Sequence, residues 1–134
     1  MPLDSGTLGV LLGELRPQLL GTRVDKIQQP QKDKVLLTLR GYGMGGKLLL
    51  CAGMGNARLH ITALSYENPE QPPMFCMLLR KHLAGAKLSA MDQPPNERIV
   101  QLRFETYNEL GDPAGKTLVL ELIGRQCNLI LVDD

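Results

Sequence analysis

The spacing of the apolar residues changes along this chain, and the change follows a glycine. The first segment carries leucines at the spacing of one helix face: Leu8, Leu11, Leu12, Leu15 and Leu19. After Gly21 the apolar residues alternate with polar ones, which is the period of a half-buried strand. The pattern therefore predicts a helix that packs on β-structure.

The first helix has candidate signals at both ends. Asp4 or Ser5 is placed to cap its start, and Gly21 to adopt the left-handed conformation after its end. Pro17 lies inside the stripe and lacks a backbone donor. We expect the helix to kink there, or to end and restart as a short turn.

Four short strands are predicted next, over residues 23–27, 34–40, 47–51 and 58–62, with a turn over 28–33. Short polar or glycine-rich turns join them, so an antiparallel meander is the expected arrangement. The segment from Ser65 to Pro73 holds three prolines and no periodicity. It is the clearest connector in the chain.

A second helical stripe follows this connector and ends at Gly85: Phe75, Leu78, Leu79, His82 and Leu83. Four more strands are predicted over residues 87–91, 98–105, 116–122 and 128–132. The predicted fold class is α+β, a mainly antiparallel sheet of meander or sandwich type with two packed helices, in one domain over residues 1–134. Because the last strand runs to Asp133-Asp134, we expect a fragment of a longer multidomain protein.

Charge and hydropathy exclude several classes of protein. Fifteen basic and fourteen acidic residues give a net charge of +1, so any binding of nucleic acid would need a local patch. No apolar run approaches the roughly 18 residues of a membrane span. The N-terminus has no basic region ahead of an apolar one, which excludes a typical signal peptide. We expect neither a membrane partner nor a cofactor.

The cysteines and histidines do not form a recognisable site. Cys51, Cys76 and Cys127 all lie in apolar segments, which favours buried thiols in a reducing cytoplasm over a disulfide or a reactive thiol. The chain has no Cys-x-x-Cys or His-x-x-x-His spacing, so zinc is not expected. His60 and His82 have no triad partner nearby in sequence, and a structural role is the default for both.

The segment from Gly41 to Gly46 matches the dinucleotide-binding fingerprint Gly-x-Gly-x-x-Gly. That fingerprint requires a helix after it, since the pyrophosphate binds the amides of the helix N-terminus. Residues 47–50 are strand-like instead. A hairpin loop is therefore the better interpretation.

Two acid–arginine pairs lie at strand ends. Glu97-Arg98 falls at a turn that enters a strand, and Glu121 is followed by a glycine turn and Arg125. Such pairs are usually solvated and contribute little. The alternative is a recognition tip, where arginine stacks on or forks to a base and the carboxylate accepts base amino protons. The two pairs lie side by side if their strands are neighbours.

Arg80 and Lys81 lie near the C-terminal end of the second predicted helix. The helix dipole favours cations at that end, which explains them as structural. Contact with phosphates is the functional alternative. The residues alone leave both open.

Longer segments resemble the N-terminal domain of the NFACT family, also called fibronectin-binding protein A-like proteins. The resemblance covers the whole chain and is carried by residues 1–4, 14–21, 58–62, 72–83 and 124–133. The run Pro-Pro-Met-Phe-Cys-Met-Leu-Leu-Arg-Lys-His-Leu over 72–83 is long and unusual, which makes the match specific.

The resemblance implies a non-enzymatic, cytoplasmic role in ribosome quality control. Members of the family bind the large ribosomal subunit while it holds a stalled peptidyl-tRNA. They recruit tRNA, alanine tRNA in bacteria, so that residues are added to the nascent chain without mRNA. The N-terminal domain is expected to help hold the tRNA near its anticodon arm.

The resemblance also assigns candidate RNA-binding residues. The family's Asp-Arg pair maps to Glu97-Arg98, where the acid is one methylene longer, and a second group maps to Glu121 and Arg125. Where the family often has Gly-Arg-His-Ser-Asn, residues 124–128 are Gly-Arg-Gln-Cys-Asn, so a contact by that histidine is lost or altered. Arg80 and Lys81 match the family's helix.

Two alternatives accompany this resemblance. The family is distantly similar in fold to the N-terminal domain of formamidopyrimidine-DNA glycosylases, which use an exposed proline amine as nucleophile. This chain has Pro2 but carries Leu3 in place of the acid that follows it there, which argues against glycosylase chemistry. A surface fibronectin-binding adhesin is the second alternative, and the N-terminus and the odd cysteine count argue against it.

Overall fold

One antiparallel sheet of eight strands runs through the molecule, accompanied by two helices. The computed structural model describes residues 5–52, 58–63, 65–95, 97–123 and 126–133. In chain order the elements are α1 (Ser5–Leu19), β1 (Arg23–Gln31), β2 (Lys34–Gly41), β3 (Met44–Cys51), β4 (Arg58–Thr62), α2 (Met74–Leu83), β5 (Lys87–Asp92), β6 (Ile99–Tyr107), β7 (Pro113–Ile123) and β8 (Gln126–Asp133). The predicted α+β class is confirmed.

The sheet consists of two four-stranded meanders joined edge to edge. Its strand order is β4-β3-β2-β1-β5-β6-β7-β8, so β1 meets β5 although three strands and a helix separate them in the chain. One register pair, Arg23 opposite Lys87, makes this junction. Backbone hydrogen bonds continue it, from Val24 N–H to Ala86 O (2.9 Å) and from Leu88 N–H to Thr22 O (2.8 Å).

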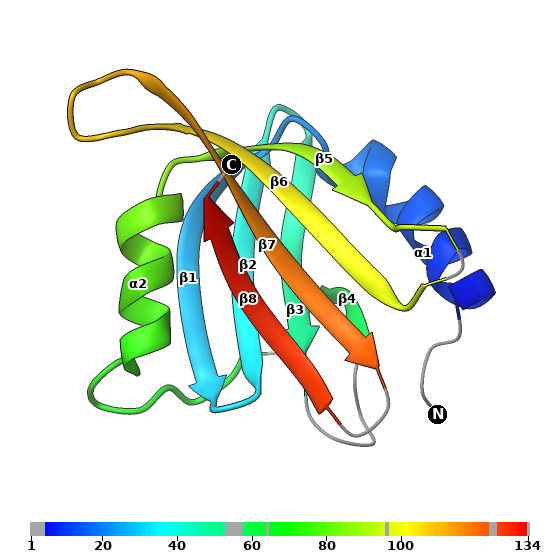
Figure 1. Cartoon of the computed structure of the whole chain (residues 1–134). Helices are drawn as coiled ribbons and strands as arrows, with labels where there is room; N and C mark the ends of the chain where they lie inside the picture. Colours follow the sequence, from blue (N-terminus) through cyan, green and yellow to red (C-terminus); the bar gives the residue numbers. More distant parts are fainter. Residues whose placement is uncertain (1–4, 53–57, 64, 96, 124–125, 134) are drawn as a thin grey trace.

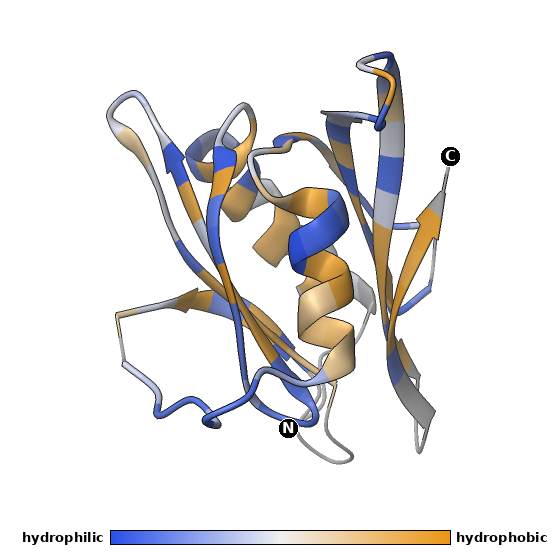
Figure 2. Cartoon of the chain, turned by 90° about the vertical axis from the view of Figure 1, so that its left-hand side faces the viewer, coloured by the Kyte–Doolittle hydropathy of each residue, from blue (hydrophilic) through white to orange (hydrophobic). Residues whose placement is uncertain are grey.

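The two meanders face one another around a shared core. Figure 1 shows β5–β8 lying in front of β1–β4, with α1 and α2 on opposite flanks, and Figure 2 shows α2 between the two halves of the sheet. Leu12 of α1, Leu79 of α2 and Phe104 of β6 are fully buried in one continuous apolar cluster. Both helices thus cover the open sides between the meanders, which is why each needs an apolar stripe.

Helix α1 continues through Pro17 to Leu19 without interruption. The expectation that it ends and restarts at the proline is therefore wrong. Pro17 lies in the last turn of the helix, so only one backbone hydrogen bond is lost there. Gly21 follows with a φ of 89°, as the sequence predicts for the left-handed residue after the helix. The predicted cap Asp4 lies outside the described residues.

Strand β1 is longer than the sequence predicts. The predicted turn over 28–33 is wrong, because β1 runs to Gln31 and only residues 32 and 33 form the turn. The pairing register shifts between Gln28 and Gln31, and Pro30 falls in this irregularity. A bulge is where a sheet tolerates a residue without an N–H, so the proline does not end the strand.

Strand β6 presents two contrasting faces. Val100, Leu102 and Phe104 are buried, while Gln101 and Arg103 between them are exposed. This alternation, and the register of β6 with β7, defines an outer face that runs the length of both strands. Every candidate site discussed below except α2 lies on or beside this face.

Candidate functional site

The first candidate site lies where β6 begins and β7 ends. Ile99 of β6 is opposite Glu121 of β7, and Leu122 N–H donates to the carbonyl of Arg98 at 2.8 Å. Arg98 and Glu121 thus lie on neighbouring strands, as the sequence predicts for these strand ends, but one residue out of register, since Glu121 is opposite Ile99 and Arg98 meets Leu122. We call Glu97, Arg98 and Glu121 the strand-end site.

The exposure of the strand-end site suits contact with a partner. Glu97 is exposed, while Arg98 and Glu121 are half-buried. The turn before them is held by Glu97 N–H donating to Pro94 O at 3.2 Å and by Gln93 Nε2 donating to Glu97 O at 2.6 Å. Partial burial and a fixed turn restrict the side chains before any ligand arrives. Arg125, the fourth predicted member, lies outside the described residues.

Arg80 and Lys81 lie away from the strand-end site, on the helix at the opposite flank of the molecule (Figure 1). Both side chains are exposed. Arg80 Nε donates to the carbonyl of Ile27 at 2.9 Å, which fastens α2 to β1. Arg80 therefore has a structural contact, whereas Lys81 projects from the last turn.

The two described cysteine side chains belong to the core. Cys51 and Cys76 are both buried. Burial raises the pKa of the Cys76 thiol, although the Arg80 charge and the Gln29 backbone hydrogen bond act in the opposite direction. The thiol donates to Ile27 O at 3.6 Å. A protonated, buried thiol is a poor nucleophile, as the sequence predicts. The side chain of Cys127 is not among those that the structure describes.

His60 has a structural role. Its Nε2 accepts from Arg58 Nε at 3.1 Å, and its Nδ1 is 3.1 Å from Ile61 O. Both ring nitrogens therefore have a polar partner within the chain. His82 is half-buried on α2.

The glycine-rich segment forms a tight hairpin between β2 and β3, with Gly41 opposite Met44. Gly45 has a φ of 120°, and a Cβ there would lie 2.3 Å from Leu39 O. Glycine is thus required by the close approach of two backbones. The interpretation of this segment as a hairpin loop is confirmed.

Residues 5–52, 58–63, 65–95, 97–123 and 126–133 contain neither a metal site nor a spanning helix. In these ranges no group of three or more His, Cys, Asp or Glu side chains is arranged to hold a metal ion. None of their helices has the length and apolar character needed to cross a membrane. The glycosylase alternative depends on Pro2, which lies outside the described residues.

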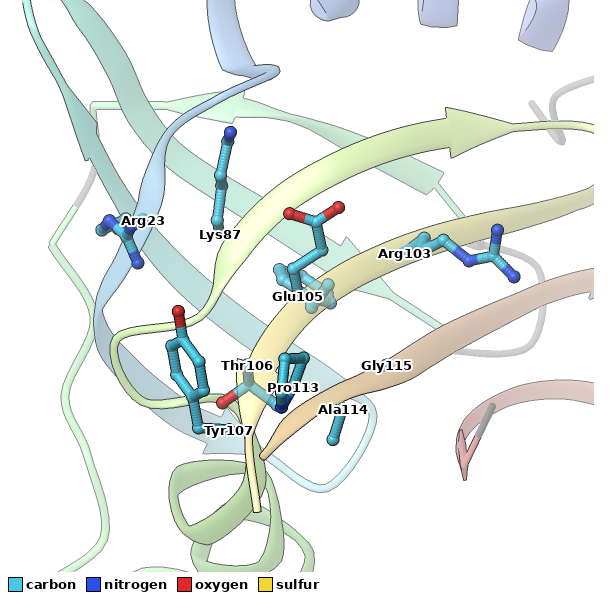
Figure 3. Close-up of a pocket in the computed structure, with 10 residues that line it drawn as sticks. Arg23, Lys87, Arg103, Glu105, Thr106, Tyr107, Pro113, Ala114 and Gly115 are labelled. Atoms are coloured by element: carbon cyan, nitrogen blue, oxygen red, sulfur yellow. The ribbon is translucent and has the colours of Figure 1, made fainter. Parts of the chain in front are cut away.

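A second candidate site was missed by sequence reasoning. At the other end of the same outer face, a hollow of about 540 Å³ is lined by Arg23 of β1, Lys87 of β5, and Glu105 and Tyr107 of β6. We call these four residues, with the β7 backbone beside them, the junction hollow (Figure 3). They are spread over most of the chain, so only the pairing of β1 with β5 brings them together.

Comparison with known proteins places the chain in a family. The family model for the NFACT N-terminal and middle domains matches residues 4–134. The chain belongs to the NFACT family. The Rqc2 homolog RqcH of Bacillus subtilis is 44% identical over 120 residues, which is 90% of this chain and 21% of that protein. The Rqc2 homolog RqcH of Streptococcus pneumoniae strain D39 is 38% identical over 133 residues, or 99% of this chain and 24% of that protein.

Solved structures of fibronectin-binding proteins share this fold. The N-terminal domain of fibronectin-binding protein PavA from Streptococcus pneumoniae superposes with a TM-score of 0.94 at 37% identity, covering 98% of this chain and 52% of that one. The eight-stranded antiparallel sheet with two helices is therefore the architecture of this NFACT region. The chain spans less than a quarter of the length of the two curated relatives above.

Proposed function

We propose that this chain is the tRNA- and large-ribosomal-subunit-binding domain of a ribosome quality-control factor. The observation that carries the proposal is family membership over residues 4–134, together with relatives named RqcH. A human relative, 32% identical over 126 residues, is named ribosome quality control complex subunit NEMF. In this role the domain binds RNA and is not itself an enzyme, and the factor works in the cytoplasm.

The proposed reaction context is tailing of a stalled nascent chain. The factor binds the large subunit, through its rRNA and the stalled peptidyl-tRNA, and recruits alanine tRNA. Alanine is then added to the C-terminus of the nascent chain without mRNA. This domain makes part of the contacts that hold the incoming tRNA.

The strand-end site and Arg125 are the proposed tRNA contacts. The guanidinium of Arg98 can fork to a phosphate or a base edge, and the carboxylates of Glu97 and Glu121 can accept base amino protons. The position of Arg98 and Glu121 on adjacent strands, both half-buried, supports this assignment. Arg80 and Lys81 would add phosphate contacts from α2.

The isolated domain is expected to bind tRNA weakly. Its net charge is +1, and phosphate neutralisation supplies most of the affinity of RNA-binding proteins. The remainder of a full-length relative, more than three quarters of its length, raises the effective concentration of this domain at its site. The decisive experiment therefore uses the full-length protein.

The test is crosslinking and RNA sequencing from cells. We expect wild-type protein to recover one tRNA species together with large-subunit RNA, and Arg98→Ala/Arg125→Ala protein to lose the tRNA. Lys32→Ala is the matched control, because Lys32 is an exposed cation in the β1–β2 turn. Unchanged tRNA recovery by the double variant would contradict the site, and recovery of no RNA by the wild type would contradict the function.

Binding of fibronectin is the second candidate, favoured by the names of the solved relatives. The PavA domain is named as fibronectin-binding, and a Streptococcus suis domain with a TM-score of 0.94 is named as fibronectin- and fibrinogen-binding. Surface plasmon resonance against immobilised fibronectin separates the candidates. Saturable binding that Arg98→Ala leaves intact would favour adhesion over the ribosomal role.

A further inference from the structure

The junction hollow gathers positive charge on a nearly neutral chain. Arg23 and Lys87 lie on one side of it with Glu105 beside them, and these three side chains carry a charge of +1, whereas the third cation of the lining, Arg103, extends away along β6. The whole chain carries +1, so the remaining residues sum to 0. Arg23 and Lys87 thus form a local positive patch, which a nearly neutral chain needs to bind nucleic acid.

Arg23 and Lys87 are held side by side by the sheet. They are register partners across β1 and β5, and directly opposite residues of an antiparallel pair have Cα atoms about 4.5–5.5 Å apart. Arg23 Nη1 donates to Gly85 O at 3.1 Å, which orients the guanidinium. Both side chains are exposed. Two cations at such a spacing repel each other unless an anion lies between or over them.

The nearby acids leave much of this charge available. Asp25 Oδ2 is 2.9 Å from Arg40 Nε, so this carboxylate is paired with Arg40 of β2, the register partner of Arg23. Glu105 is opposite Lys87 in register, but among the described residues the two form no ion pair within 4 Å. One carboxylate beside two cations lowers the positive charge of the hollow without neutralising it.

Tyr107 gives the hollow an aromatic wall. The side chain is 71% exposed, at the end of β6 and opposite Pro113. Figure 3 shows its ring and the Glu105 carboxylate rising on the side of Arg23 and Lys87, whereas the Arg103 guanidinium extends away along β6. Gly115, opposite Glu105, has no side chain to fill the space. An exposed ring beside cations can stack a base.

We propose that the junction hollow binds one phosphate of an RNA strand between Arg23 and Lys87, with the adjoining unpaired base against Tyr107. The proposal rests on the proposed RNA-binding function and adds a second contact to it. From Ile99 to Tyr107 the eight residue steps of β6 span roughly 26 Å at ~3.3 Å each, so the two contacts are separate sites at opposite ends of this strand.

An NMR titration of this chain with pentauridylate locates the contact directly. Pentauridylate supplies phosphates and unpaired bases without a folded arm. The amide signals of Arg23, Lys87 and Tyr107 should shift together and saturably. Inorganic phosphate and uridine, titrated separately, should each bind more weakly. Shifts confined to other residues, or equal binding of inorganic phosphate, would overturn the RNA site.

Four variants test the chemistry without breaking the Arg23 hydrogen bond. Lys87→Gln should weaken the binding of pentauridylate about fivefold and should lower the slope of log affinity against log salt concentration by about 0.7. Tyr107→Ala should weaken it at least about fivefold, whereas Tyr107→Phe keeps the stack. Glu105→Gln should tighten it about twofold. An effect of Lys87→Gln no larger than that of the control Lys32→Gln would overturn the proposal.

Full-length protein and bulk tRNA separate this proposal from the proposed function. Loss of tRNA in Arg98→Ala with full retention in Lys87→Gln and Tyr107→Ala would overturn the junction hollow alone. Weakening by both sets of variants supports both sites. Failure of wild-type protein to bind tRNA would overturn the proposed function, and pentauridylate shifts at the hollow would then still identify an RNA contact.

Discussion

The two ends of the outer face of β6 and β7 are built in different ways. The strand-end site comes from the two arms of one hairpin, with the backbone of Arg98 bonded to that of Leu122. The junction hollow combines Arg23 of the first meander with Lys87 and Tyr107 of the second. The first site therefore depends on the register of one hairpin, and the second on the docking of two halves of the molecule.

Weakening the junction should have the largest effect and should separate the two sites. Leu88 is fully buried, and its N–H bonds to Thr22 O across the β1–β5 junction. Leu88→Ala should lower the free energy of unfolding by about 2–5 kcal/mol because it leaves a cavity. Urea denaturation measures the loss, with Ile130→Ala as an exposed control expected to change it by less than about 0.5 kcal/mol. Equal losses in the two variants would contradict a junction held by core packing.

A double-mutant cycle on tRNA affinity sharpens the comparison. Arg98→Ala should cost about 1–3 kcal/mol if the arginine reads a base, and Lys87→Gln should cost less as a phosphate contact. The sites are more than about 10 Å apart, so the two effects should add within about 0.5 kcal/mol. Fluorescence anisotropy with full-length protein provides the four affinities. A coupling energy above about 1 kcal/mol would mean that the two ends act as one site.

The two cations of α2 should differ from each other. Arg80→Ala removes the hydrogen bond to Ile27 O and should lower the free energy of unfolding by about 1 kcal/mol, since the donor is charged but exposed. Lys81→Ala should leave stability within about 0.5 kcal/mol. Thermal unfolding compares them. If Lys81→Ala alone reduces tRNA recovery, α2 contributes phosphate contact through Lys81 and structure through Arg80.

The pH dependence of Cys76 should give the smallest effect. Its folded pKa is raised from the ordinary 9.0 by burial, so the unfolded thiol loses its proton first as pH rises. The contribution to stability is complete below pH 9.0 and is lost as pH rises from there through the folded pKa. Urea midpoints of wild type and Cys76→Ala should therefore approach each other as the pH rises above 9.0. A difference that stays constant would contradict this assignment.

Local patterns predicted most of the secondary structure. The stripe of α1, the helix that ends before Gly85, the strand over residues 58–62 and the left-handed Gly21 are confirmed. The predicted stripe of α2 is confirmed only in part, because Leu79 and Leu83 are buried but Leu78 is exposed and Cys76 is buried in its place. The errors concern two prolines that were expected to interrupt an element and do not. Pro17 costs a single hydrogen bond in the last helical turn, and Pro30 lies in a bulge, so neither proline ends its element.

The strand-end site was accessible to sequence reasoning because it is local in topology. Residues 97–98 and 121 flank one hairpin, and an antiparallel hairpin brings its outer ends together. The sequence could not reveal the junction hollow. Arg23, Lys87 and Tyr107 carry no shared motif, and their meeting depends on the edge pairing of β1 with β5.

The sequence by itself determined the helices, the short strands, the buried thiols and the family, because these follow from side-chain periodicity, burial and long residue runs. Tertiary structure decided which strand edges meet and which charges gather over them. Strand pairing between distant segments is set by the packing of the whole core, to which both helices and both meanders contribute. A near-neutral chain acquired its positive hollow only through that packing.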